Sequence, residues 1–306
     1  MTPASGARPQ RAVVIINPLS GRGRYDAQIQ GHAALARDVL ARRQIEAVVR
    51  PTTGPGDATA FAQEAVAAGV DLVVAWGGDG TVNETARALV STSVPLGIVP
   101  AGSGNGLAAD LRVPFAPLAA LEVAATAPTQ AIDVGTVNDC YFFNVAGVGI
   151  DAVIAARFAE RGLRRRGFAA YAQLSTSELM RYRVQRYDLV VDDEPAEHEA
   201  LLVAFANGRQ YGNRMLIAPG ARLDDGLLEL VVIERLSLLT IAWRLPSLFR
   251  GTLAPGRGVH MRAARRVRIR SSAPIPFHVD GEPRTGADEL DVSVLPGSLL
   301  VRAPAL

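Results

Sequence analysis

The first 110 residues alternate short apolar segments with helix-forming segments, and this alternation restricts the fold more than any other feature. Apolar and β-branched residues predict strands at 12–16, 45–50, 71–75 and 96–99. Helices are predicted at 26–43, 57–68 and 82–90, with Asp57 as an N-cap, and a further helix begins at Asn105. This order predicts a parallel sheet covered by helices, with ligands bound at the carboxyl ends of the strands.

Three of these predicted strands end in turns rich in glycine and hydroxyl residues, at 16–21, 77–81 and 99–106. Because parallel strands end at one edge of a sheet, the three turns can line one crevice. The third turn contains Gly102, Gly104 and Gly106, which is not the spacing of a dinucleotide-binding fingerprint. A Rossmann dehydrogenase is therefore disfavoured.

The second turn combines glycine with one carboxylate at the start of a helix. Gly77, Gly78 and Gly80 let backbone approach a ligand, and a helix that starts at Thr81 presents unpaired N–H groups. The spacing is not that of a P-loop, and the chain has no lysine, so backbone amides, hydroxyls, arginine or a metal must hold a phosphate here. An ordinary strand-to-helix turn is the alternative.

The second half of the chain is predicted to be a separate antiparallel domain, because strands follow one another with few helices between them. Helices are expected at 152–181 and 237–250, the second kinked or ended by Pro246. We place the domains at 1–130 and 131–296. The last apolar run, 298–302, could return to either domain, and we expect 297–306 to complete the first. The predicted strands are 131–137, 141–146, 185–191, 200–207, 228–234, 267–270, 277–279 and 290–294.

Composition indicates a folded protein of a reducing compartment. The 306 residues are 49% hydrophobic and 20% charged, with a net charge of +2, which gives no reason to expect nucleic acid binding. Cys140 is the sole cysteine, so no intrachain disulfide can form. No apolar run approaches the roughly 20 residues of a membrane span, and a cytoplasmic location is expected. The four histidines show no metal-binding spacing and are expected on the surface or in packing; they are His32, His198, His260 and His278.

Five motifs together resemble the diacylglycerol kinase catalytic-domain superfamily, which includes bacterial soluble lipid kinases and the sphingoid-base and ceramide kinases. They occur in the family's order and cover nearly the whole chain. The matching residues are Asn17-Pro18-x-Ser20-Gly21, Gly77-Gly78-Asp79-Gly80-Thr81-x-Asn83-Glu84, Pro100-x-Gly102-Ser103-x-Asn105-x-x-Ala108, Ala218-Pro219-x-Ala221-x-x-x-Asp225-Gly226 and Asp280-Gly281-Glu282.

The resemblance implies an N-terminal α/β domain like those of phosphofructokinase and NAD kinase, a C-terminal antiparallel β-sandwich, and ATP between them. Asp79 would organise Mg²⁺ directly or through water, or it shapes its own turn. The implied nucleotide site consists of Asn17, Pro18, Ser20, Gly21, Thr52, Gly77, Gly78, Asp79, Gly80, Thr81, Asn83, Glu84, Gly102, Ser103 and Asn105. Thr52 is the least secure member of this site, because Thr53 is adjacent to it. A structural role, in which the Thr52 hydroxyl only caps the strand end, is equally compatible with the sequence.

The resemblance also implies two sites in the second domain. Asp225 would bind a structural metal together with the backbone carbonyls of Arg222 and Leu227, although Asp-Asp-Gly is equally a turn signal. Glu282 would be the general base for a lipid hydroxyl with Asp280 as its partner, although Asp-Gly between strands is a hairpin signal.

The resulting hypothesis is a lipid kinase that uses ATP and Mg²⁺ to phosphorylate diacylglycerol or a related lipid at the cytoplasmic membrane face. A sphingoid-base or ceramide kinase, NAD kinase and a non-catalytic nucleotide- or lipid-binding regulator stay open, as does a homodimer. Peripheral contact with an anionic membrane would involve arginines 164–166, the alternating Arg266, Arg268 and Arg270, or the apolar Trp243, Leu248 and Phe249. For the arginines the alternative is a solvated basic face, and for the apolar residues it is packing in the core.

Overall fold

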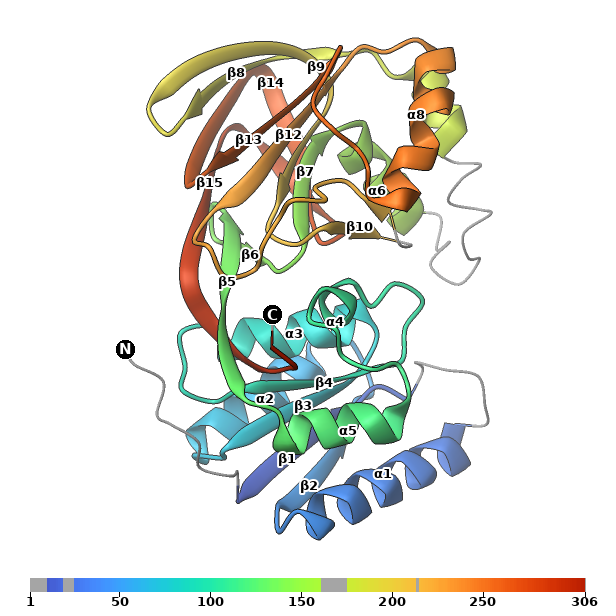
Figure 1. The fold of residues 1–306 in the computed structure, drawn as a ribbon, viewed down its shortest axis with the longest axis vertical. Helices are drawn as coiled ribbons and strands as arrows, with labels where there is room; N and C mark the ends of the chain where they lie inside the picture. The colour runs from blue at the N-terminus through green and yellow to red at the C-terminus, as the bar shows by residue number, and fades with distance from the viewer. Residues whose placement is uncertain (1–9, 19–24, 161–174, 213–214, 306) are drawn as a thin grey trace. The chain divides into compact units, whose positions relative to one another are not determined.

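The computed structural model describes residues 10–18, 25–160, 175–212 and 215–305 (Figure 1). The chain divides into two compact units. The first unit is Met1–Ile132 with Gly297–Leu306, and the second is Asp133–Pro296. The boundary predicted at 130/131 lies two residues before this division.

The first unit contains a parallel sheet in the order β2-β1-β3-β4, with the end of β15 beside β4 (Figure 1). The strands are β1 (Arg11–Ile16), β2 (Glu46–Pro51), β3 (Leu72–Gly77), β4 (Leu96–Pro100) and β15 (Glu282–Arg302). Every residue of β3 and β4 is buried, as expected for central strands of a sheet covered on both faces. The predicted α/β fold of this unit is confirmed.

Five helices accompany this sheet among the described residues of the first unit. They are α1 (Tyr25–Arg42), α2 (Asp57–Ala67), α3 (Asp79–Leu89), α4 (Gly106–Asp110) and α5 (Pro117–Thr126). Helix α5 was not predicted. It packs closely on β4, because a Cβ at Gly97 would lie 2.7 Å from the Cβ of Ala124. The prediction of Asp57 as an N-cap is wrong: Gly56 occupies that position and Asp57 is the first helical residue.

The second unit is predominantly antiparallel, with strands β13-β12-β9-β7-β14-β15 in order. Strand β8 pairs with both β9 and β14, so β7, β9, β8 and β14 form a closed ring of paired strands. The remaining elements are β5 (Thr129–Val137), β6 (Cys140–Phe142), β7 (Val145–Gly149), α6 (Ile150–Glu160), β8 (Gln185–Val191), β9 (Glu194–Ala206), β10 (Gln210–Gly212), β11 (Met215–Leu216), β12 (Leu228–Glu234), α8 (Leu238–Arg250), β13 (Val259–Ala264) and β14 (Arg266–Val279).

Two apolar clusters lie on opposite faces of the strands of the second unit. The first cluster includes Tyr187, Phe205 and Ile269. The second includes Leu202 and Ala204, and residues of helix α6 pack into it. Because side chains alternate along a strand, β9 contributes Phe205 to one cluster and Ala204 to the other. The predicted β-sandwich is confirmed.

Several predicted elements of the second unit have different bounds. The segment 141–146 is two strands, β6 and β7, and the runs 267–270 and 277–279 both belong to β14. Strand β13 was not predicted. Of the helix expected at 152–181, the structure describes α6 and helical backbone at 175–181. Pro246 does not end α8, which continues to Arg250. Within the described residues, no helix is long and apolar enough to cross a membrane.

Candidate nucleotide and acceptor sites

The carboxylate of Asp79 joins two glycine turns of the first unit. Its Oδ2 accepts the backbone N–H of Asn105 at 2.9 Å, and its Oδ1 accepts that of Gly106 at 2.8 Å. Asp79 follows β3 and Asn105 follows β4, which are neighbouring parallel strands. The 77–81 and 99–106 turns therefore meet at one edge of the sheet, as their positions in the sequence predicted.

The two turns fit together because glycine occupies the contact positions. A Cβ at Gly102 would lie 2.6 Å from the Cα of Gly78, and a Cβ at Gly104 would lie 2.5 Å from Oδ2 of Asp79. Asn105 has a φ of 54°, and its side chain exchanges hydrogen bonds with the backbone N–H and C=O of Gly102 at 2.9 and 2.7 Å. The third turn is therefore held in one conformation by its own asparagine and by Asp79.

Helix α3 directs its N-terminus toward the same edge of the sheet. Gly78 is the N-cap, and because it is glycine it has no side chain to cap the helix. The Nδ2 of Asn17, after β1, donates to the hydroxyl of Thr81 at 3.0 Å, so the first turn also reaches this helix end. Pro18 is buried beside Asn17, whereas the predicted Ser20 and Gly21 lie outside the described residues. Unpaired N–H groups at a helix N-terminus favour an anion.

Thr52 and Thr53 have different environments. Thr52 is buried and its backbone N–H donates to Ile16, whereas the hydroxyl and N–H of Thr53 both donate to the Asp57 carboxylate at 2.8 and 2.7 Å. These bonds, with one from the N–H of Gly54, lower the pKa of Asp57. Asp57 therefore fixes the loop after β2 instead of capping α2.

Asn83 and Glu84 are the last two residues of the motif that runs from Gly77 to Glu84, and they lie one turn further into α3. Asn83 is buried, and Oε2 of Glu84 accepts the N–H of Gly56 at 3.0 Å. The backbone C=O of Glu84 accepts the hydroxyl of Thr59 at 3.0 Å. Through these two hydrogen bonds Glu84 connects α3 to the start of α2, and so it holds the N-terminal turn of α3 in position.

In the second unit, Asp280 and Gly281 form the two-residue turn between β14 and β15. Their φ values are 49° and 77°, as a type I′ hairpin requires. The Asp280 carboxylate accepts the N–H groups of Phe143, Asn144 and Val145 at 2.8 to 3.1 Å. Burial raises the pKa of the Asp280 carboxyl, and the N–H donors act in the opposite direction. Asp280 therefore fastens the hairpin to the β6–β7 turn.

Glu282 follows this turn and pairs with an arginine on its own strand. Its Oε2 lies 2.9 Å from Nη2 of Arg284, and the side chain of Glu282 retains 23% of its exposure. Of the two predicted acids, Asp280 is occupied by three backbone donors, whereas Glu282 has access to solvent. The structure thus assigns the two carboxylates different environments on one hairpin.

A buried polar cluster that the sequence analysis missed lies beside this hairpin. Oδ2 of Asp151 accepts from Nε2 of His278 at 2.9 Å and from the Tyr211 hydroxyl at 2.8 Å. The N–H of Gly281 donates to Nδ1 of His278 at 3.2 Å, which places the ring proton on Nε2. A Cβ at Gly147 would lie 2.1 Å from Oδ2 of Asp151, so glycine makes room for the cluster.

His278, expected on the surface or in packing, is buried and has specific hydrogen-bond partners in this cluster. Helix α6 carries Asp151, and β14 carries His278 at a distance of 127 residues along the chain. The glycines of 147–149 before an acidic helix start were a local signal for Asp151. No local signal marked His278 or Tyr211, because the contact is made by tertiary structure.

The predicted metal turn at 222–227 is fixed by a buried acid. Oδ2 of Asp133 accepts the N–H of Gly226 at 2.7 Å, and Oδ1 of Asp225 accepts the N–H of Leu227 at 3.1 Å. The guanidinium of Arg222 pairs with Asp224. Burial and the charge of Asp225 both raise the pKa of Glu229. These bonds fix the turn, and the metal binding predicted for Asp225 with the carbonyls of Arg222 and Leu227 stays a prediction.

The sequence profile of the diacylglycerol kinase catalytic domain matches residues 11–137, and that of the YegS C-terminal NAD kinase β-sandwich-like domain matches residues 144–303. A Chromohalobacter salexigens protein named "Probable lipid kinase YegS-like" is 34% identical over 84% of this chain and 83% of its own. A Mycobacterium tuberculosis protein named "Diacylglycerol kinase" is 32% identical over 96% of this chain and 95% of its own.

Solved structures show the same fold. A crystal structure of a diacylglycerol kinase from Bacillus anthracis superposes with a TM-score of 0.75 at 20% identity. A second structure from that bacterium gives 0.80 at 22% identity. Each comparison covers 97% of this chain and 98% of the other.

Proposed function

Because this chain belongs to the family of the diacylglycerol kinase catalytic domain and carries the YegS C-terminal domain, we propose that it is an ATP- and Mg²⁺-dependent lipid kinase. The transferred group is the γ-phosphate, and the acceptor is a hydroxyl of diacylglycerol or a related lipid. The observation that carries this proposal is the junction of two glycine turns through Asp79 at the carboxyl edge of the parallel sheet.

The nucleotide binds at this junction. Backbone N–H groups of the 77–81 turn and of the α3 N-terminus face the phosphates, and the hydroxyls of Thr81 and Ser103 add donors. Phosphoryl transfer depends mainly on positioning and on charge neutralisation. Since the chain has no lysine, bound Mg²⁺ supplies the charge compensation that a lysine supplies in a P-loop. Asp79 holds the two turns together through both of its oxygens and would supply negative charge beside bound Mg²⁺.

Glu282 acts as the general base. Its carboxylate takes the proton of the lipid hydroxyl as the hydroxyl oxygen bonds to the γ-phosphorus, and the bond to the β-phosphate oxygen breaks to release ADP. Arg284 holds Oε2 of Glu282 at 2.9 Å, and the 23% exposure of the Glu282 side chain lets a substrate approach it. Asp280 keeps the hairpin in place through its three backbone contacts. General base catalysis contributes about 10²- to 10⁴-fold.

A pocket in the second unit, lined by both apolar and polar residues, suits a lipid with an apolar acyl part and a polar headgroup. Its volume is about 1100 Å³, and its lining includes Leu179, Met180, Leu201, Leu236 and Ile241, with Arg183 and Arg235 adding positive charge. Ligand pockets of this kind are commonly lined by apolar side chains with a few polar ones. The pocket accepts an acyl chain and the arginines attract an anionic headgroup or surface.

Helix α8, which begins beside this pocket, contacts the membrane. Trp243 is 80% exposed, and Leu245 and Phe249 are exposed as well. Exposed aromatic and apolar side chains on one helix favour insertion into the lipid headgroup region. The alternative surface on β14 is less suited, because Arg266 pairs with Asp291 and Arg270 pairs with Glu289 at 2.8 Å. Arginines 164–166 lie outside the described residues.

The test is a transfer assay with labelled ATP, Mg²⁺ and mixed micelles that contain diacylglycerol, ceramide or a sphingoid base, with NAD in a separate arm. We expect label in diacylglycerol or a related lipid, and none without Mg²⁺. The absence of transfer to every lipid would contradict the proposal. Transfer to NAD alone would identify the chain as an NAD kinase.

The variant Glu282→Gln keeps the size of the side chain and removes the base. Its turnover should fall by about 10²-fold or more while ATP affinity stays within about twofold of wild type. Glu289→Gln, on the same strand, is the matched control and should keep turnover near wild type. A Glu282→Gln enzyme with normal turnover would show that the base is a different group.

A further inference from the structure

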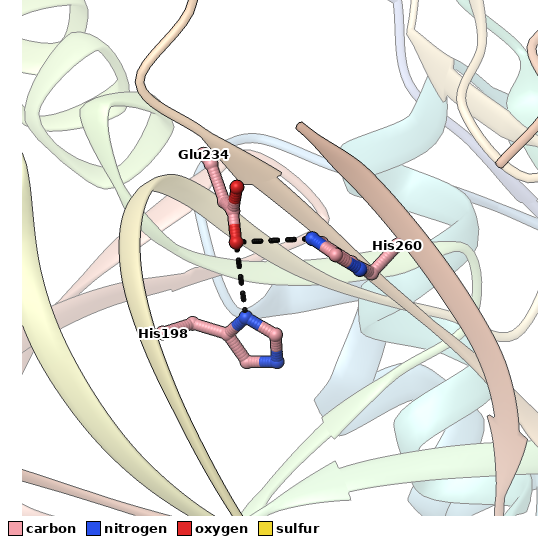
Figure 2. Close-up of side chains that lie close together, drawn as sticks. All are labelled: His198, Glu234 and His260. Atoms are coloured by element: carbon pink, nitrogen blue, oxygen red, sulfur yellow. Dashed lines mark hydrogen bonds and ion pairs between the residues drawn. The ribbon is translucent and has the colours of Figure 1, made fainter. Parts of the chain in front are cut away.

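Two histidines that are far apart in the sequence lie against one glutamate in the second unit (Figure 2). Oε1 of Glu234 is 3.0 Å from Nε2 of His260 and 3.4 Å from Nδ1 of His198. The two imidazole rings are 5.0 Å apart at an angle of 46°. The three ligating atoms all lie within 4.8 Å of one another. Spacing along the sequence did not mark this group, because the fold brings the three side chains together.

The three side chains come from three adjacent strands and share one face. His198 is on β9, Glu234 ends β12 and His260 is on β13. Strand β12 lies between the other two. His260 is the register partner of Val232, which lies two residues before Glu234 and therefore on the same face. Strand register therefore brings the three side chains together, at the edge of the apolar cluster that includes Tyr187.

Within the described residues, the charge of Glu234 faces imidazoles and not a guanidinium. Among the described residues, its carboxylate forms ion-pair contacts with these two imidazoles and with no arginine. Neutral imidazoles are metal ligands, and a carboxylate with two of them is a common donor set for zinc. Without a cation, each ring nitrogen that faces Oε1 must carry a proton.

We propose that His198, Glu234 and His260 bind Zn²⁺, with water in the remaining position. Ligand atoms about 2.0 to 2.2 Å from a tetrahedral ion lie roughly 3.3 Å from one another, and the two distances to Glu234 are 3.0 and 3.4 Å. The side chains are 20%, 39% and 50% exposed, so the ion and its water can enter from solvent. Imidazole ligands select Zn²⁺ over Mg²⁺.

The bound ion joins β9, β12 and the edge strand β13. Strand β13 has one neighbour in the sheet, so its hydrogen bonds are paired on one side. An ion that binds the folded chain and not the unfolded one raises stability as its concentration exceeds Kd. The zinc site therefore stabilises the edge of the sheet by linking β13 to β12 and β9. None of its residues belongs to the Asp280–Glu282 hairpin.

The experiment uses full-length protein without a histidine tag, stripped with EDTA and dialysed. Calorimetric titration with Zn²⁺ at pH 7.5 should give one ion per chain, and the binding should persist in excess Mg²⁺. Tm should rise with Zn²⁺ concentration. His198→Ala, Glu234→Gln and His260→Ala should each weaken binding at least about tenfold. Zinc affinity in these variants equal to that of wild type would overturn the proposal.

Three controls isolate the cluster. Glu199→Gln removes a carboxylate on the opposite face of β9, and His32→Asn removes an imidazole from the first unit. Cys140→Ser removes the sole thiol. All three should keep wild-type zinc affinity, and loss of binding in any of them would place the ion elsewhere. Co²⁺ in the same site should show the visible absorption of a tetrahedral complex, which the His260→Ala variant lacks.

Discussion

Oδ2 of Asp151 and Nε2 of His278 lie 2.9 Å apart, although the two residues are 127 positions apart in the sequence. The contact links the first turn of α6 to β14, immediately before the hairpin that carries Glu282. Tyr211 completes the cluster with a hydrogen bond to the same Asp151 oxygen. The side chains of Asp151 and His278 are 4% and 6% exposed, so their polar atoms depend on one another for hydrogen bonds.

Removal of the Tyr211 hydroxyl should destabilise the fold. Tyr211→Phe leaves the buried Asp151 carboxylate without one donor, and the free energy of unfolding should fall by about 1 to 3 kcal/mol. Urea unfolding measures this loss. Tyr141→Phe is the control, because within the described residues the Tyr141 side chain makes no hydrogen bond. This variant should change the free energy of unfolding by less than about 0.5 kcal/mol. Equal losses in the two variants would show that the cluster adds no stability.

Asp79→Asn should weaken nucleotide binding. The amide has one acceptor oxygen, so it cannot accept both the Asn105 and Gly106 N–H groups, and the two turns separate. We expect ATP affinity to fall at least about tenfold, which is about 1.4 kcal/mol. Asp71→Asn is the matched control, because Asp71 also accepts two backbone N–H groups but lies before β3. Both bonds go to Oδ2 of Asp71, so a single amide oxygen can keep them, and ATP affinity should stay at the wild-type level.

Gly104→Ala should have a similar effect for a steric reason. The new Cβ would lie 2.5 Å from Oδ2 of Asp79, so the turn or the carboxylate must move. ATP affinity, measured by calorimetry, should fall. Gly31→Ala adds a Cβ in the middle of α1, where no atom lies within 4 Å, and should raise stability by about 0.5 to 1 kcal/mol with ATP affinity unchanged. Unchanged affinity in Gly104→Ala would mean that the contact with Asp79 is dispensable.

Trp243→Ala should reduce membrane binding without an effect on folding. Trp243 is 80% exposed on α8, so its removal deletes little intramolecular contact. Partition onto anionic vesicles, measured by sedimentation, should weaken several-fold while Tm is retained. Phe115→Ala removes another exposed aromatic side chain, in the first unit, and should leave partition unchanged. Equal vesicle binding by both variants would rule out α8 as the contact.

The contribution of Asp57 should depend on pH. Thr53 and Gly54 donate to its carboxylate and lower its pKa below the ordinary value of 3.8. Since the folded protein favours the ionised form, the stabilisation is present above that ordinary value and is lost as pH falls through the native pKa. Asp57→Asn should therefore destabilise the protein more at pH 7 than at pH 2, as urea unfolding at both values would show.

Local sequence signals predicted the elements that the backbone forms by itself. The apolar runs of β1, β3 and β4 and the glycine turns after them were recognisable because strand periodicity and turn chemistry involve neighbouring residues. Helix α5 and strand β13 were missed. The segment of α5 is apolar almost all round, so it lacks the one-sided apolar stripe of a surface helix. In β13, apolar and polar residues alternate from Val259 to Arg262, so the strand pattern was present in the sequence.

The sequence by itself determined the two-part fold and the glycine turns after β3 and β4, since each depends on short-range patterns. The roles of Asp79, Asp280 and Glu282 came from the resemblance to the kinase family and stay predictions. Tertiary structure alone decided which groups these acids contact: Asp79 bonds to the turn after β4, and Asp280 bonds to the β6–β7 turn. It also brought His278 to Asp151 and His198 to Glu234. Such pairs depend on strand register and helix packing, which no spacing along one strand or helix encodes.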